Sequence, residues 1–272
     1  MVDLGSGPPL VLIPGIQGRW EWMRPTVEAL ARHFRVLSFS LAGERTSGHV
    51  FDPALGFDNF IVQIDRVLEE ADVRSVVLCG VSYGGLIAAR YAALRPHRTD
   101  ALVLASALAP GYTPDARVRF YSRAPWLLSP LFVMNAWRRS RPEVRTALPG
   151  RRERLAFSAG QCWRVAANPT SPALMRGRIR LIEGLDLTSS VREITAPTLL
   201  ITGEPELDRV VPPDHTLEYA ALLPHAERLT FERTGHIGVV TRPARFAEAV
   251  AAFVSGAAAE GHERPRRVAG RS

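Results

Sequence analysis

Val76-Val77-Leu78-Cys79-Gly80-Val81-Ser82-Tyr83-Gly84-Gly85-Leu86-Ile87-Ala88-Ala89-Arg90 is the stretch that decides the fold of this chain of 272 residues. Residues 76–79 form a short β-branched run that predicts a buried strand, whereas residues 86–94 have apolar side chains at helical spacing. The spacing of apolar residues therefore changes from that of a strand to that of a helix at Ser82. A serine at such a corner adopts a strained backbone that exposes its Oγ, and Gly80 and Gly84 remove the Cβ atoms that would collide there.

The pattern Gly-x-Ser-x-Gly is weak evidence by itself. A glycine-rich turn with a serine capping the following helix would have the same residues without any catalytic role. The rest of the chain must therefore decide between the two interpretations.

Strand and helix patterns alternate along the first 110 residues. Strands are expected at 10–13, 34–39, 76–79 and 101–105, and helices at 25–33, 57–71 and 86–94. This alternation predicts an α/β fold with a mostly parallel, doubly wound sheet and helices on both faces. In such a sheet, catalytic groups gather at the carboxyl ends of the strands.

The alternation stops between residues 111 and 187. This segment has no buried-type strand, and it has fourteen arginines against five acidic residues. Its many prolines, Pro130 and Pro142 among them, are expected to break its helices. We interpret it as a helical cap, inserted into a core formed by residues 1–110 and 188–256. Strands at 198–202 and 227–231, with helices at 213–223 and 243–254, restore the core pattern. Residues 257–272 are small and charged, and we expect a disordered tail there.

A serine hydroxyl needs a base to take its proton, and the base needs a third group to hold its tautomer. His236 follows the last expected strand, in Gly235-His236-Ile237-Gly238, and Asp208 follows the strand before it. Glu204 and Glu206 compete for the role of the acid. We favour Asp208 because Arg209-Val210-Val211-Pro212 follows it.

The chain resembles the α/β-hydrolase family over nearly all its length, through these three segments in their order. The resemblance implies Ser82 as nucleophile, His236 as base and Asp208 as orienting acid, and a cap inserted after the sixth strand. One departure is Pro14-Gly15, where the family commonly has His-Gly, so bracing of the oxyanion loop by that histidine is absent.

The main-chain N–H groups of Ile16 and Tyr83 are our expected oxyanion hole. Tyr83 begins the helix after Ser82, where unsatisfied donors favour an anion. Gln17 could add a side-chain donor for the substrate, although a solvated loop glutamine is the simpler interpretation.

Residues 124–137 of the cap are strongly apolar and include Trp126 and Trp137. An apolar cap face that packs on the core, with solvated arginines, is one explanation. A substrate pocket lined by these tryptophans, with arginines attracting an anionic acyl or aryl substrate such as a coenzyme A thioester or a carboxylated lactone, is another. Peripheral membrane contact through the cap is a third.

Composition limits the compartment, the cofactors and the partners that we expect for this protein. No apolar run reaches the ~20 residues of a spanning helix, no secretory leader is evident, and two separated cysteines suggest no disulfide framework, so we expect a cytoplasmic protein. We expect no metal and no other cofactor, because ligand-type residues do not cluster. The arginines lack a nucleic-acid-binding motif, and the oligomeric state stays open.

These observations predict a serine hydrolase that cleaves an ester, thioester or lactone of a small apolar or anionic substrate. Acyl transfer, carbon–carbon bond hydrolysis or a lyase reaction on the same triad are alternatives, and a non-catalytic ligand receptor is a further one. The family branches that use an aspartate nucleophile, haloalkane dehalogenases and epoxide hydrolases, are disfavoured by the serine.

Overall fold

A seven-stranded sheet forms the centre of the protein. The computed structural model describes the backbone of residues 1–263 and the side chains of residues 1–259. The strand order is β1-β3-β2-β4-β5-β6-β7, with β1 antiparallel to β3 and every other neighbouring pair parallel. The strands are β1 (Val2–Leu4), β2 (Pro9–Ile13), β3 (Arg35–Ser38), β4 (Val76–Val81), β5 (Thr99–Ala105), β6 (Thr198–Thr202) and β7 (Glu227–Thr230). The predicted fold class is confirmed.

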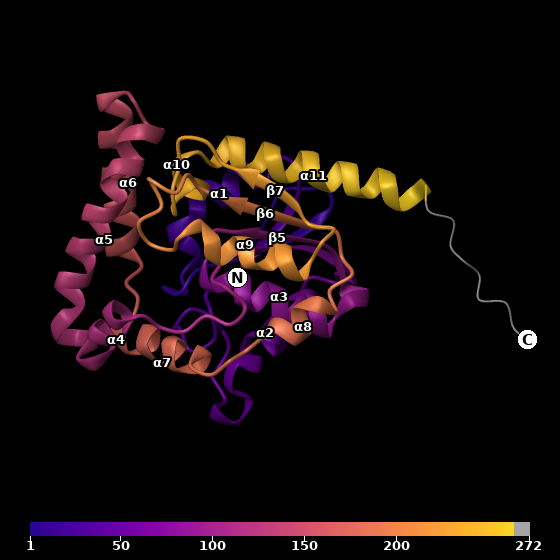
Figure 1. Cartoon of the computed structure of the whole chain (residues 1–272), viewed down its shortest axis with the longest axis horizontal. Helices are drawn as coiled ribbons and strands as arrows, with labels where there is room; N and C mark the ends of the chain where they lie inside the picture. Colours follow the sequence, from indigo (N-terminus) through magenta and orange to yellow (C-terminus); the bar gives the residue numbers. More distant parts are fainter. Residues whose placement is uncertain (264–272) are drawn as a thin grey trace, which may run out of the picture.

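Helices cover both faces of this sheet (Figure 1). One face packs on α2 (Asn59–Glu70), α3 (Tyr83–Leu94), α8 (Thr188–Arg192) and α9 (Pro213–Leu222). The other packs on α1 (Arg24–Leu30), α10 (Gly238–Thr241) and α11 (Pro243–Glu263). Side chains of β2 alternate between the two, since Val11 and Ile13 join the first apolar cluster and Leu10 and Leu12 the second. Short 3₁₀ helices occur at η1 (Trp20–Met23), η2 (Pro53–Asp58) and η3 (Pro96–Arg98).

The cap consists of α4 (Ala116–Arg123), α5 (Pro125–Ala147), α6 (Arg151–Ala167) and α7 (Pro172–Ile182). In Figure 1, α5 and α6 occupy the left end of the molecule, beyond the sheet. The insertion follows β5, the fifth strand of this chain, and not the sixth. The strand count differs because only one strand, the three-residue β1, comes before β2 along the chain.

Two local predictions are corrected. Pro130 and Pro142 lie inside α5 and do not break it. The last helix continues to Glu263, nine residues past its predicted end at Val254, so residues 257–263 are helical and only 264–272 fall outside the described residues. The alanines after Gly256 favour helix strongly enough to outweigh Gly256 and Gly261.

The apolar stretch of α5 does not pack on the core as its sequence suggested. Trp126 and Leu127 expose 66% and 80% of their surface, and the buried residues of α5 are Glu143, Val144 and Ala147. The buried part of α5 thus lies in its last two turns.

Candidate active site

Ser82 stands at a strained corner between β4 and α3. Its φ of 55° and ψ of −118° lie outside the ordinary regions for a residue with a side chain. A Cβ at Gly80 would lie 2.4 Å from the Gly84 carbonyl oxygen, and one at Gly84 would lie 2.4 Å from that of Ile13. Glycine is therefore required on both sides of the serine, as its sequence context predicted.

Asp208 and His236 lie together on the loops that follow β6 and β7. The Asp208 Oδ2 and His236 Nδ1 atoms are 3.4 Å apart, within ion-pair distance, but Nδ1 makes no hydrogen bond to any residue that the structure describes. The other carboxylate oxygen, Oδ1, accepts the N–H groups of Val210 at 3.0 Å and Val211 at 2.9 Å. These bonds fix the carboxylate so that one oxygen stays directed at the imidazole.

Two glycines allow the acid loop and the histidine loop to approach. A Cβ at Gly203 would lie 2.6 Å from the Gly235 Cα, and one at Gly235 would lie 2.5 Å from the Leu207 carbonyl oxygen. The Glu204 N–H also donates to the Thr234 carbonyl at 2.8 Å. The pairing of Asp208 with His236 therefore depends on backbone contact between neighbouring loops.

Neighbouring carboxylates influence the pKa of the His236 imidazole. Burial by itself lowers the pKa of His236, but the carboxylates of Asp208 and Glu143 outweigh it, and the net direction is upward from the ordinary 6.5. A raised pKa favours the imidazolium that forms when the base accepts a proton.

The oxyanion loop, residues 14–18, lies against Ser82. A Cβ at Gly15 would lie 3.6 Å from the Ser82 Cβ and 2.7 Å from the Gln17 Oε1, so the Gln17 side chain folds back over this glycine. Ile16 is the residue after this glycine, and Tyr83 follows Ser82 directly at the start of α3. The loop that carries Ile16 and Gln17 thus approaches Ser82, and the roles of these residues stay predictions.

Glu143 of the cap was missed by the sequence reasoning. The residue is 1% exposed, and Oε2 accepts the Ile237 N–H, next to His236, at 3.1 Å. The second oxygen, Oε1, is buried and has no hydrogen-bond partner in the described part of the chain. Burial raises the pKa of Glu143 to about 7. Nothing in an arginine-rich helix marked this glutamate, because only the folded chain places it beside the histidine loop.

The two predicted substrate-binding tryptophans lie elsewhere on the cap. Trp137 borders an open cleft of about 600 Å³, shared with Pro130, Met134 and Cys162 of α6, whose lining includes no residue of the predicted triad. Trp126 is largely exposed near the start of α5. Contact of either side chain with substrate stays a prediction.

The described residues hold neither a metal-binding cluster nor a membrane-spanning helix. Among the side chains of residues 1–259, no three His, Cys, Asp or Glu form a group that could hold a metal ion. In the same part of the chain, every helix is too short or too polar to cross a bilayer.

Two curated relatives align with most of the chain. A pimeloyl-[acyl-carrier protein] methyl ester esterase of Klebsiella pneumoniae is 27% identical over 86% of this chain and 87% of its own length. A 2-hydroxy-6-oxo-2,4-heptadienoate hydrolase of Pseudomonas putida is 25% identical over 86% of this chain and 84% of its own length.

Solved structures agree on the fold. A bromoperoxidase from Bacillus anthracis superposes with a TM-score of 0.74 at 21% identity, covering 93% of this chain and 94% of that one. The family model for the alpha/beta hydrolase fold matches residues 8–243, which include the elbow, the acid loop and the histidine loop. Because this family model matches most of the chain, and the chain has the predicted mostly parallel sheet, the chain belongs to the alpha/beta hydrolase fold family.

Proposed function

We propose that this protein is a serine hydrolase that cleaves an ester-type bond of a small substrate through an acyl-enzyme on Ser82. The observation that carries the proposal is the meeting of three strand ends, with Ser82 after β4 and an Asp208–His236 pair, 3.4 Å apart, after β6 and β7. Family membership and the esterase and hydrolase relatives support a hydrolytic reaction.

In this reaction the Ser82 Oγ attacks the substrate carbonyl while His236 Nε2 accepts the hydroxyl proton. The negative charge on the carbonyl oxygen is stabilised by the N–H groups of Ile16 and Tyr83, and Asp208 stabilises the imidazolium. When the carbon–oxygen bond breaks, the leaving alkoxide takes the proton from His236. Water then attacks the acyl-enzyme by the same route and restores Ser82.

The same steps apply to a carboxylic ester, a thioester or a lactone, because each presents an acyl carbon with a leaving heteroatom. Carbon–carbon bond hydrolysis is a second candidate, favoured by the relative whose name describes a hydrolase of 2-hydroxy-6-oxo-2,4-heptadienoate. Transfer of the acyl group to an alcohol or a thiol uses the same intermediate.

Labelling by a fluorophosphonate probe tests the proposal. Wild-type protein should be labelled at Ser82, and Ser82→Ala and His236→Ala should not be. An unlabelled but folded wild type would refute the nucleophile assignment. Product analysis of p-nitrophenyl butyrate turnover, with and without added methanol or thiol, separates hydrolysis from transfer.

The exposed face of α5 and α6 supports a proposal about partners. Trp126 and Trp163 expose 66% and 73% of their surface, and the two helices carry eight arginines against two glutamates. Of those glutamates, Glu143 is buried and Glu153 accepts the Gly150 N–H. Aromatic side chains beside uncompensated cations suit an anionic lipid surface, whereas a second copy of the chain would add like charge.

A further inference from the structure

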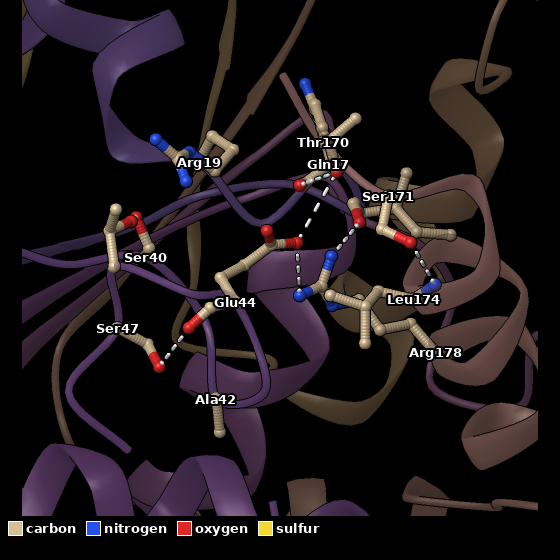
Figure 2. Close-up of polar contacts among 12 residues, drawn as sticks. Gln17, Arg19, Ser40, Ala42, Glu44, Ser47, Thr170, Ser171, Leu174 and Arg178 are labelled. Atoms are coloured by element: carbon tan, nitrogen blue, oxygen red, sulfur yellow. Dashed lines mark hydrogen bonds and ion pairs between the residues drawn. The ribbon is translucent and has the colours of Figure 1, made fainter. Parts of the chain in front are cut away.

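One residue of the cap contacts both residues of the proposed oxyanion hole. Arg178, on α7, donates from Nη1 to the Ile16 carbonyl at 2.9 Å. The carbonyl of the same arginine accepts the Tyr83 hydroxyl at 3.3 Å. Figure 2 shows its guanidinium directed toward Gln17 and Glu44, which lie on the loops after β2 and after β3.

The guanidinium is held in this position by a buried ion pair. Arg178 Nη2 lies 2.9 Å from Glu44 Oε1, and the two side chains are 3% and 4% exposed. Burial lowers the pKa of Arg178 while Glu44 opposes the shift. Such a pair adds little net stability compared with apolar packing, so its retention calls for another reason.

Gly18 makes room for the guanidinium. A Cβ at this position would lie 2.4 Å from Arg178 Nη1, and the glycine has a φ of +69°. The carbonyls of residues 16, 17 and 18 are each bound, by Arg178 Nη1, by the Thr170 hydroxyl at 2.7 Å and by the Leu41 N–H at 2.9 Å. Two of these three donors belong to the cap.

An oxyanion hole works only when its donors are fixed before charge develops. A peptide unit is planar and joins the carbonyl of one residue to the N–H of the next, so the Ile16 N–H moves with the Gly15 carbonyl. That carbonyl accepts the Gly18 N–H at 2.9 Å, and Arg178 binds the Ile16 carbonyl on the other side of the residue. Both peptide units that flank Ile16 are thereby held. This chain has Pro14-Gly15 at the start of the loop, without a histidine brace.

We propose that Arg178, paired with Glu44, is a positioning residue that fixes the Ile16 N–H in the oxyanion hole, so that the hole is complete only when the cap is docked. The inference rests on the proposed acyl-enzyme mechanism. Arg178 acts on the loop and does not itself touch the reacting atoms.

The test compares Arg178→Gln with Arg180→Gln, which removes the same charge from an exposed position of the same helix. With p-nitrophenyl butyrate, Arg178→Gln should lower kcat by about 10- to 100-fold with KM changed less than about threefold, since a misplaced donor weakens mainly the transition state. The affinity for an aryl boronic acid, which forms a tetrahedral adduct with the serine, should fall in parallel. Arg180→Gln should leave all three quantities unchanged.

Further variants keep the test decisive. Arg178→Lys retains the charge but cannot bridge Glu44 and the Ile16 carbonyl with a planar fork, so it should restore only part of kcat. If Arg178→Gln does not fold, Thr170→Val, which removes only the hydroxyl on the Gln17 carbonyl, should give a smaller loss of kcat and boronate affinity. Thr170→Val with wild-type values would then overturn the inference.

A folded Arg178→Gln protein whose kcat matches that of Arg180→Gln, or whose loss lies in KM alone, also overturns it. Failure of the mechanism has a different signature, because wild-type protein would then escape fluorophosphonate labelling and Ser82→Ala would keep its activity.

Discussion

The core and the cap bury their side chains to very different degrees. Every residue of β4 and β6 is buried, whereas α4 and α6 have no buried residue. The buried residues of α5 cluster in its last two turns, and those of α7 are Arg178, Ile179 and Ile182. The buried part of each of these two helices includes one charged residue, Glu143 on α5 and Arg178 on α7.

The two buried charged residues of the cap, Arg178 and Glu143, have different partners. Arg178 meets a carboxylate, Glu44, and so forms a neutral pair at the oxyanion loop. Glu143 accepts the Ile237 N–H, next to His236, and its Oε1 has no hydrogen-bond partner among the residues that the structure describes. The core thus carries Ser82, Asp208 and His236, while the cap makes polar contacts with neighbouring loops.

The largest effect is expected in the core. Ser82→Ala should reduce kcat/KM for p-nitrophenyl butyrate by at least about 10³-fold, because the acyl-enzyme cannot form. Ser106→Ala is the matched control, since Ser106 also follows a strand and also has a positive φ, of 44°. Comparable losses in both variants would mean that strained strand-end backbone, rather than the Ser82 hydroxyl, explains the effect.

Glycine-to-alanine substitutions should have opposite effects on protein stability in the core and in the cap. Gly84→Ala should lower the free energy of unfolding by about 1–3 kcal/mol or prevent folding, because its Cβ would meet the carbonyl oxygens of Ile13 and Pro14 at 2.4 and 2.6 Å. Gly177→Ala, in α7, has no atom within 4 Å of its new Cβ and should raise stability by up to about 1 kcal/mol. Urea denaturation measures both, and destabilisation by Gly177→Ala would contradict the loose packing of the cap.

Glu143 should give the cap a pH-dependent stability. Its folded pKa of about 7 lies above the ordinary 4.5, so the folded state holds the proton more tightly than the unfolded chain does. This contribution is fully present below about pH 4.5 and is lost as the pH rises through about 7. Relative to Glu143→Gln, the wild-type Tm should therefore fall as the pH is raised from about 5 to about 8.

The exposed Glu153→Gln serves as the control on α6. A wild-type Tm that tracks Glu143→Gln at every pH would show that the carboxyl titrates normally. The pH dependence of kcat/KM on the acid side is a second, independent measurement of the Glu143 charge. Because the Glu143 carboxylate raises the pKa of His236, Glu143→Gln should shift the acid limb of this profile to lower pH.

The smallest effect on activity is expected at the outer face of the cap. Replacing Trp126 and Trp163 by serine should change the free energy of unfolding by less than about 0.5 kcal/mol, since both are largely exposed. The same double variant should lose co-sedimentation with phosphatidylglycerol vesicles, which wild-type protein should show more strongly at low salt than at high salt. Equal sedimentation of both proteins, or a wild-type dimer abolished by the substitutions, would rule out the lipid contact.

Prediction from the sequence succeeded where a pattern is local. The strand at Thr198–Thr202 has its predicted bounds, because a short β-branched run between turns has few alternatives. Predictions failed in the cap, where prolines 130 and 142 were expected to interrupt a helix that continues through both. The apolar face of α5 was expected to pack on the core, but periodicity cannot tell which surface, if any, will cover an apolar face.

The sequence by itself determined the fold class, the elbow at Ser82, and the order of the acid and histidine loops, because glycine turns and buried strands are specified by neighbouring residues. Only the tertiary structure decided that Arg178 and Glu44 are paired and that Glu143 lies beside His236. These contacts join residues 134 and 94 positions apart, and long-range burial of charge has no signature in the local pattern of residues.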